Sequence, residues 1–161
     1  MTKNQDNSFL SSPLEKKILI IGYGNTLRGD DGIGQIIAEE IEKLNLEGIE
    51  ILALHQLTPD IAGKIIEYKG VFFIDASQNT ELNEVQVLPL QPSENSPKIE
   101  HAMNPEDILK LAEDLYNFYP KAFCFLIPAR NFSFTESLSD LTKSMIQPAI
   151  KIITEKIKSF C

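Results

Sequence analysis

The chain has 161 residues, a length that favours one domain with its own hydrophobic core. Its 43% hydrophobic and 24% charged residues are typical of a globular protein in water. The formal net charge of −8 argues against nucleic acid or anionic lipid as a partner, and no apolar run approaches the roughly 18 to 20 residues of a membrane-spanning helix.

The N-terminal segment is polar and lacks the apolar stretch of a secretory signal. We expect residues 1–15 to form a flexible tail and residues 16–161 to form a single α/β domain. Cys124 and Cys161 cannot make a disulfide framework or a zinc finger, so we expect reduced thiols in a cytoplasmic protein.

Strand and helix patterns alternate along the chain. The predicted strands cover residues 17–21, 49–54, 71–74, 84–90 and 122–127. Two predicted helices cover about residues 59–68 and 139–158. Two more begin at about residues 32 and 105. This order predicts a three-layer α/β/α fold, with a mostly parallel, twisted, five-stranded sheet and helices on both faces. The polar alternation in 84–90 indicates an edge or antiparallel strand.

Several residues predict helix starts and breaks. Either Asp30 or Asp31 is a suitable cap for the first helix, and Thr58 is one for the second, with Pro59 at its first position. Asn104 precedes the third helix, and Pro148 is expected to kink or break the last one.

Residues 17–34, KILIIGYGNTLRGDDGIG, hold the densest set of functional signals. An apolar strand leads into a glycine-rich loop with two adjacent acids, and a helix follows at once. Ligands of open α/β sheets bind at the carboxyl ends of strands. Right-handed crossovers should bring the loops of Asp31, His55 and Asp75 together at one edge.

Several known motifs do not fit this loop. Leu27 occupies the third glycine position of a dinucleotide-binding fingerprint, and His55 stands where the ribose-binding acid is expected. No phosphate-binding Gly-Lys-Ser/Thr follows, and neither a nucleophilic serine elbow nor a zinc-protease helix is present. A Cys–His dyad is not expected, whereas Asp31 and Asp75 permit an aspartic-type dyad.

A metal site is a further possibility. Asp75 ends an apolar strand, where a carboxylate is costly unless it is paired or bound to a cation, although a turn-forming aspartate would also suit the position. The chain has two histidines, His55 and His101, and neither by itself indicates a metal ligand. Together, two carboxylates and one imidazole suit zinc or nickel and leave coordination positions open.

Residues 22–34, GYGNTLRGDDGIG, resemble the signature G-x-G-N-x-L-x-x-D-[DE]-G-x-G of the nickel–iron hydrogenase maturation endopeptidases. Asp75 matches the family's second ligand position, and His101 with Pro105 is similar to its histidine loop. Pro128, before the final long helix, is similar too. The resemblance covers about residues 16–158.

The resemblance implies an endopeptidase that removes the C-terminal extension of a hydrogenase large-subunit precursor after nickel insertion. Asp31, Asp75 and His101 would form its catalytic, metal-binding triad. The metal would be mainly the nickel held by the precursor, with zinc or another divalent ion able to bind in vitro. The triad would then detect metal loading before cleavage.

One segment departs from the common family pattern. Many members carry a stretch such as Asp-Gly-Gly after the second strand, where this chain has His55-Gln56-Leu57. That variant resembles the proteases that serve bidirectional, NAD(P)-linked hydrogenases, so we expect such a substrate and contacts to it from Asn25, His55 and Gln56. Alternatively, these residues only shape the loop.

Two other functions would use the same residues. One is a metal-dependent hydrolase of a small molecule with its own tightly held zinc, and the other is a nickel-sensing chaperone module that binds the precursor without cutting it. We expect a monomer whose partner is the nickel-loaded precursor.

Overall fold

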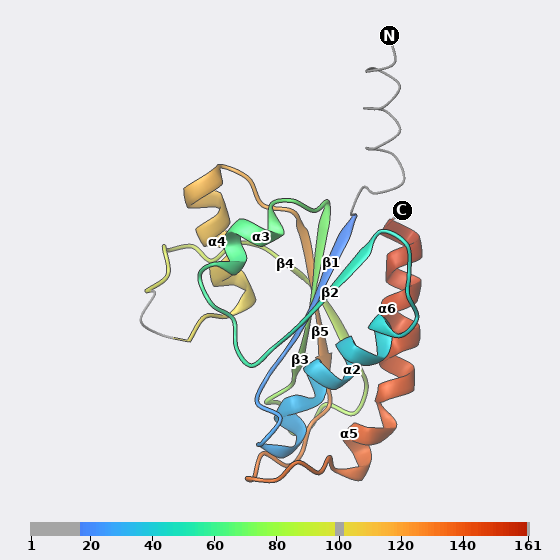
Figure 1. The fold of residues 1–161 in the computed structure, drawn as a ribbon. Coiled ribbons are helices and arrows are strands. Elements are labelled where there is room, and N and C mark those ends of the chain that lie inside the picture. The colour runs from blue at the N-terminus through green and yellow to red at the C-terminus, as the bar shows by residue number, and fades with distance from the viewer. Residues whose placement is uncertain (1–16, 99–101, 161) are drawn as a thin grey trace.

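The computed structural model describes residues 17–98 and 102–160, which build a single five-stranded sheet with helices on both faces (Figure 1). The expected tail, His101 and Cys161 lie outside the described residues. The strands are β1 (Ile18–Tyr23), β2 (Ile49–Leu54), β3 (Gly70–Ala76), β4 (Gln86–Leu90) and β5 (Lys121–Ile127). The helices are the 3-10 helix η1 (Gly29–Gly32), α2 (Ile33–Glu42), α3 (Ile61–Ile65), α4 (Pro105–Tyr116), α5 (Asp140–Ser144) and α6 (Ile146–Phe160).

The strand order in the sheet is β2-β1-β3-β5-β4. The first four strands of this order run parallel, and β4 pairs antiparallel with β5 at one edge. The prediction of an edge or antiparallel strand is therefore confirmed, as is the mostly parallel sheet. None of the helices among the described residues is long and apolar enough to cross a membrane.

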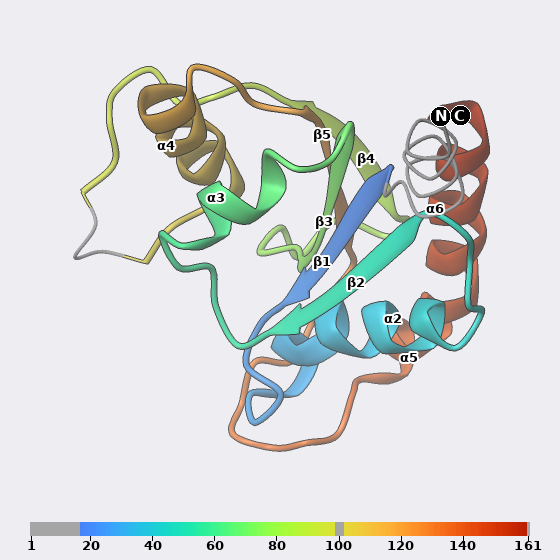
Figure 2. The ribbon, with the colours of Figure 1, turned by 45° about the horizontal axis from the view of Figure 1, so that its top comes forward.

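The sheet separates two hydrophobic cores. Leu19, Ile21 and Phe73 pack with α3 and α4, whereas Phe72 and Phe125 pack with α2 and α6. Because successive side chains of a strand point to opposite faces, a continuous apolar run fills both cores. Figure 2 shows α3 and α4 on one side of the strands and α2 and α6 on the other, which confirms the three-layer arrangement.

The helix expected from Pro59 to Tyr68 is shorter than predicted. α3 begins at Ile61, and no side chain caps it. The hydroxyl of Thr58 donates a hydrogen bond to the Asp60 carboxylate, while the Thr58 carbonyl accepts the N–H of Ile61 in a turn. The prediction of a Thr58 cap was wrong because that side chain contacts a neighbouring acid instead of the backbone.

The predicted break in the last helix is confirmed. The Ser139 hydroxyl accepts the N–H of Thr142 and caps α5, which ends at Ser144. Pro148 lies in the first turn of α6 and has no N–H for the carbonyl four residues earlier, so one helix cannot continue through this point.

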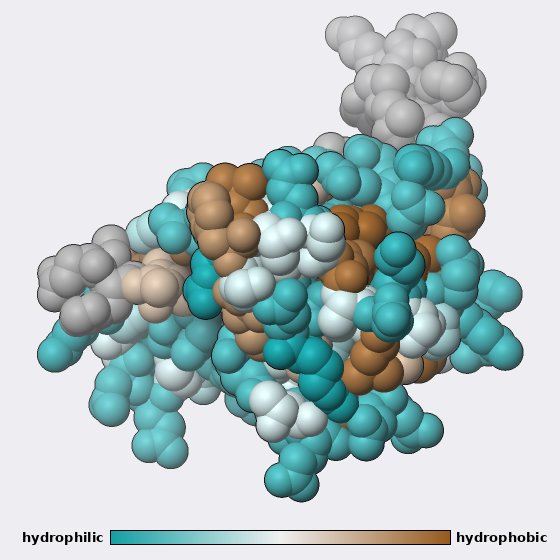
Figure 3. All heavy atoms as spheres, turned by 90° about the horizontal axis from the view of Figure 1, so that it is seen from below, coloured by the Kyte–Doolittle hydropathy of each residue, from teal (hydrophilic) through white to brown (hydrophobic). Residues whose placement is uncertain are grey.

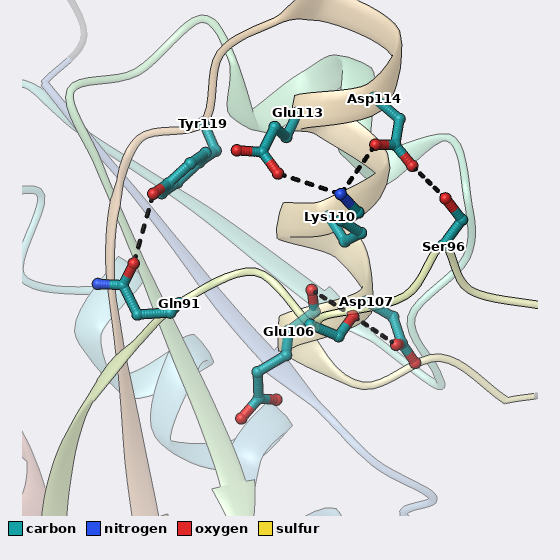
Figure 4. A network of polar contacts seen from close by, with 9 residues as sticks. Gln91, Ser96, Glu106, Asp107, Lys110, Glu113, Asp114 and Tyr119 are labelled. Carbon is teal, nitrogen blue, oxygen red and sulfur yellow. Dashed lines mark hydrogen bonds and ion pairs between the residues drawn. The ribbon is translucent and has the colours of Figure 1, made fainter.

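The segment before α4 is tied to that helix by polar contacts, several of which Figure 4 shows. The Ser96 hydroxyl donates to Asp114 at 2.7 Å, and Lys110 lies 3.2 Å from the same carboxylate group. Asn104 caps α4 through a complete capping box with Asp107, which confirms the helix start predicted there. The chain is thus held to α4 shortly before and after residues 99–101.

Candidate functional site

A cleft of about 380 Å³ opens at the carboxyl ends of β1 and β3. The chain leaves β1 through α2 on one face of the sheet and leaves β2 through α3 on the other face. Such a topological switch point is where open α/β sheets bind ligands. Asp31, His55 and Asp75 all line the cleft, so the predicted convergence of their loops is confirmed.

The glycines of residues 22–34 allow the loop to fold tightly. A Cβ atom on Gly22 would lie 2.0 Å from the carbonyl oxygen of Gly34, and one on Gly34 would lie 2.4 Å from that of Ile74. Gly24 has a φ of +142°, and its Cβ would meet the Asp31 carbonyl at 1.9 Å. Because these glycines have no Cβ, the start of α2 packs closely against β1 and β3, and Asp31 lies beside the cleft.

The Asp31 carboxylate is held by its own loop. The backbone N–H of Asn25 donates to Oδ2 of Asp31 at 2.8 Å, and the Asn25 side chain accepts the N–H of Leu27 at 2.9 Å. Both Asn25 and Asp31 are half-buried and line the cleft. Asn25 therefore orders the loop in addition to lining the cleft.

The environment of Asp30 differs from that of Asp31. Asp30 is fully buried, and it accepts the N–H groups of Arg130, Asn131 and Ser139 at 2.8 to 2.9 Å and the Ser139 hydroxyl at 2.7 Å. Burial by itself raises the pKa of a carboxyl group, but these donors outweigh it and lower the pKa of Asp30 to about 2.

The prediction that Asp30 or Asp31 caps the first helix was wrong. Gly32 occupies the N-cap position of α2, and no side chain caps either η1 or α2. The loop turns through η1 before the helix starts, so Asp30 points to the segment 128–139 and Asp31 borders the cleft.

Asp75 lies within β3, one residue before its end, and it faces Tyr23 of the neighbouring strand. The Tyr23 hydroxyl donates to Oδ2 of Asp75 at 2.9 Å. Burial, with a smaller contribution from the charge of Asp31, raises the pKa of Asp75 to about 6, although hydrogen bonds from Tyr23 and the Ala76 backbone act to lower it. Burial and the nearby carboxylate also raise the pKa of Tyr23, so the phenol stays a donor.

The rest of the cleft is lined from several loops. His55 and Gln56 are exposed at its border, and Arg28 lines the same cleft. His101 lies outside the described residues, but Ala102 directly after it lines the cleft. Among residues 17–98 and 102–160, no three His, Cys, Asp or Glu side chains are grouped closely enough to hold a metal ion.

Cys124 has no place in this chemistry. It is buried in β5, and burial raises the pKa of its thiol to about 12. Because a thiol attacks as the thiolate, this residue is an inert part of the core. The site residues that sequence reasoning missed are Tyr23 and Arg28. Tyr23 had one usable signal, its place beside the first glycine of the signature loop at the end of β1.

Comparison with known proteins agrees with this geometry. A protein of Methanocaldococcus jannaschii, provisionally named a hydrogenase maturation protease, is 25% identical over 156 residues, which cover 89% of this chain and 98% of that protein. No protein-family model matches the chain.

Two solved structures share the fold. The hydrogenase maturating endopeptidase HybD from E. coli has a TM-score of 0.71 and 21% identity over 89% of this chain and 93% of its own. The [NiFe] hydrogenase maturation protease HycI from Thermococcus kodakarensis has a TM-score of 0.70 and 23% identity over 93% and 99%. The chain is therefore similar over nearly its whole length to a relative named as a hydrogenase maturation protease, and it shares the fold of solved hydrogenase maturation endopeptidases.

Proposed function

We propose that this protein is the endopeptidase that removes the C-terminal extension from a nickel–iron hydrogenase large-subunit precursor after nickel insertion. The observation that carries the proposal is the pair of carboxylates, Asp31 and Asp75, in one cleft at the switch point of the sheet. Asp31 belongs to the signature loop of residues 22–34. The reaction, hydrolysis of a peptide bond, is the one that the similarity to maturation endopeptidases implies.

The proposed role of the carboxylates is to recognise nickel that the precursor brings, together with His101. Carboxylate oxygens and an imidazole nitrogen are suitable ligands for a borderline divalent ion, and zinc or a similar ion should bind them in vitro. The hydrogen bonds that Asp31 and Asp75 accept through Oδ2 fix both carboxylate groups. Ala102 in the cleft wall supports a contribution from His101.

In this proposal the nickel is part of the substrate. An ion held by the precursor's own ligands would share its open positions with the triad, and this would place the adjoining peptide in the cleft. A bound divalent ion can polarise a carbonyl group or a water molecule. Asp31 and Asp75 orient the complex, and hydrolysis adds one water across the peptide bond, with a proton going to the leaving amine.

Substrate choice is assigned to the border of the cleft. His55 and Gln56 are exposed there, and Asn25 borders the same space. Since His55-Gln56-Leu57 resembles the segment of proteases that serve bidirectional hydrogenases, we assign the precursor of such a hydrogenase as the substrate. The proposal includes a monomeric, cytoplasmic enzyme whose residues 16–161 form one domain.

The proposal is tested by incubating the purified protein with the nickel-loaded precursor of a bidirectional hydrogenase and measuring intact masses. We expect a shortened large subunit and one released C-terminal peptide. A stable complex without a shortened product would instead favour the chaperone function. Stoichiometric zinc in the purified protein, with no action on any precursor, would favour a small-molecule hydrolase.

A further inference from the structure

Two large apolar side chains are exposed beside the cleft. Leu27 is 46% exposed and Phe134 is 83% exposed, the largest value among the exposed large hydrophobic residues that the structure describes. Single exposed apolar residues are ordinary on protein surfaces. The argument for a function therefore depends on the positions of Leu27 and Phe134 and on how rigidly their segments are anchored.

The segments that carry Leu27 and Phe134 lie side by side although they are far apart in the sequence. Arg28 and Thr135 form an isolated parallel β-bridge, and the N–H of Gly29 donates to the Thr135 carbonyl at 2.6 Å. Leu27 and Phe134 directly precede the two bridged residues, one on each segment. In Figures 1 and 2, the segment after β5 runs along the loop after β1.

We call this pair the 27/134 ridge, and it lies near the cleft through the chain neighbours of Leu27. Asn25 and Arg28, on either side of Leu27 in the chain, both line the cleft. Figure 3 views the molecule from below in Figure 1, the end at which these two loops lie, and apolar side chains reach that surface in separate patches among hydrophilic ones.

The segment that carries Phe134 is firmly anchored despite its exposure. Asp30 holds both of its ends through the N–H groups of Arg130 and Asn131 on one side and of Ser139 on the other. Arg28 Nε also donates to the carbonyl of Phe132 at 3.3 Å. An anchored segment loses little conformational entropy when its exposed aromatic side chain becomes buried against a partner.

We propose that the 27/134 ridge is a docking surface for the folded body of the hydrogenase large-subunit precursor, next to the point where the C-terminal extension enters the cleft. This inference rests on the proposed function. A protein whose extension lies in the cleft must bring its own surface against the border of that cleft. Exposed aromatic side chains on rigid supports are typical binding hot spots.

The test compares steady-state cleavage of the nickel-loaded precursor by the wild type, the double variant Leu27→Ala/Phe134→Ala and the control Phe118→Ala. Phe118 is 47% exposed and precedes β5, at the opposite end of the sheet from the cleft. We expect KM to rise about tenfold in the double variant with kcat within about twofold of the wild type, and no change in the control. Thermal unfolding should be unchanged, because both side chains are exposed.

The outcomes separate the inference from the proposed function. An unchanged KM in the double variant, with the wild type active, would overturn the docking surface and leave the protease function intact. A wild type that never cuts a loaded precursor would overturn both. If light scattering shows that the wild type is a dimer and the double variant a monomer, the ridge serves self-association and the inference is overturned.

Discussion

The phenolic oxygen of Tyr23 lies 2.9 Å from Oδ2 of Asp75, so a hydrogen bond joins the carboxyl ends of the adjacent strands β1 and β3 inside the cleft. Two effects shift the pKa of Asp75 in opposite directions. Burial favours its neutral acid, whereas the phenol favours its carboxylate. The balance leaves a pKa of about 6, which is close enough to neutral pH to affect activity.

Replacing Tyr23 by Phe should move the acidic limb of the pH–activity profile to higher pH. The variant loses a donor that stabilises the carboxylate, so the pKa of Asp75 rises above about 6. The measurement is the rate of precursor cleavage between pH 5 and pH 8. Tyr68→Phe is a matched control, because Tyr68 donates a similar bond to Glu50 and does not line the cleft. An unmoved acidic limb in Tyr23→Phe would show that Asp75 need not be ionised.

Asp75 should also make the protein less stable as pH rises. Its pKa is raised in the folded state, so the folded state binds more protons than the unfolded state between about pH 4 and pH 6. The stabilisation is present below about pH 4 and is lost as pH rises through about 6. Asp75→Asn should be more stable than the wild type at pH 8 by about 1–3 kcal/mol, and about equally stable at pH 4. Urea unfolding at both pH values measures this difference, and equal stabilities at pH 8 would contradict it.

The adjacent acids Asp30 and Asp31 should give opposite results when each is changed to Asn. Asp30→Asn weakens four hydrogen bonds of a buried carboxylate and should cost about 2–4 kcal/mol of folding free energy. Asp31→Asn should abolish cleavage and change stability by less than about 1 kcal/mol.

The pH dependence of stability gives a second measurement on Asp30. Its pKa is lowered to about 2 in the folded state, so its stabilisation is present above about pH 4 and is lost as pH falls toward 2. Asp30→Asn should lack this acid-dependent loss. If Asp31→Asn unfolds the protein while Asp30→Asn does not, the assignment of a structural and a functional acid is reversed.

Gly34→Ala should prevent or severely weaken folding. The added Cβ would lie 2.4 Å from the Ile74 carbonyl oxygen and 2.7 Å from that of Tyr23, and neither backbone group can move away alone. Gly63→Ala is the control, because its Cβ would meet only the end of the Tyr116 side chain at 3.0 Å. We expect the control to change the melting temperature by only a few degrees. Equal melting temperatures for the wild type and Gly34→Ala would contradict the close packing of α2 on the sheet.

Changes at His55 or Gln56 should alter substrate choice more than folding. Both side chains are exposed at the border of the cleft, so their loss removes few internal contacts. The measurement compares cleavage of precursors from bidirectional and other nickel–iron hydrogenases by the wild type and by His55→Ala/Gln56→Ala. Identical preferences would show that these residues only shape the loop.

Local patterns predicted most of the sheet and the position of the cleft. The strand of residues 49–54 was predicted without error, and the others within about two residues, since continuous apolar runs between turns are strong signals. The helix start at Asn104 and Pro105 was also predicted, because its signals are adjacent in the sequence.

Long-range contacts were beyond the reach of such patterns. The donors to Asp30 lie about 100 residues away, so nothing near it in the sequence distinguishes it from Asp31. The Tyr23–Asp75 bond likewise joins two strands whose adjacency follows only from the sheet order. Local patterns therefore predicted a carboxylate at this edge, and the resemblance of residues 22–34 pointed to Asp31, but the buried hydrogen-bonding role of Asp30 was not predicted.

The most direct test of the central claim is cleavage of one precursor in nickel-loaded and nickel-free form, followed by intact mass for the wild type and Asp31→Asn. We expect a shortened large subunit only when the wild type meets the loaded precursor. Equal cleavage of the nickel-free precursor, or full activity of Asp31→Asn, would contradict recognition of nickel by the carboxylates of the cleft.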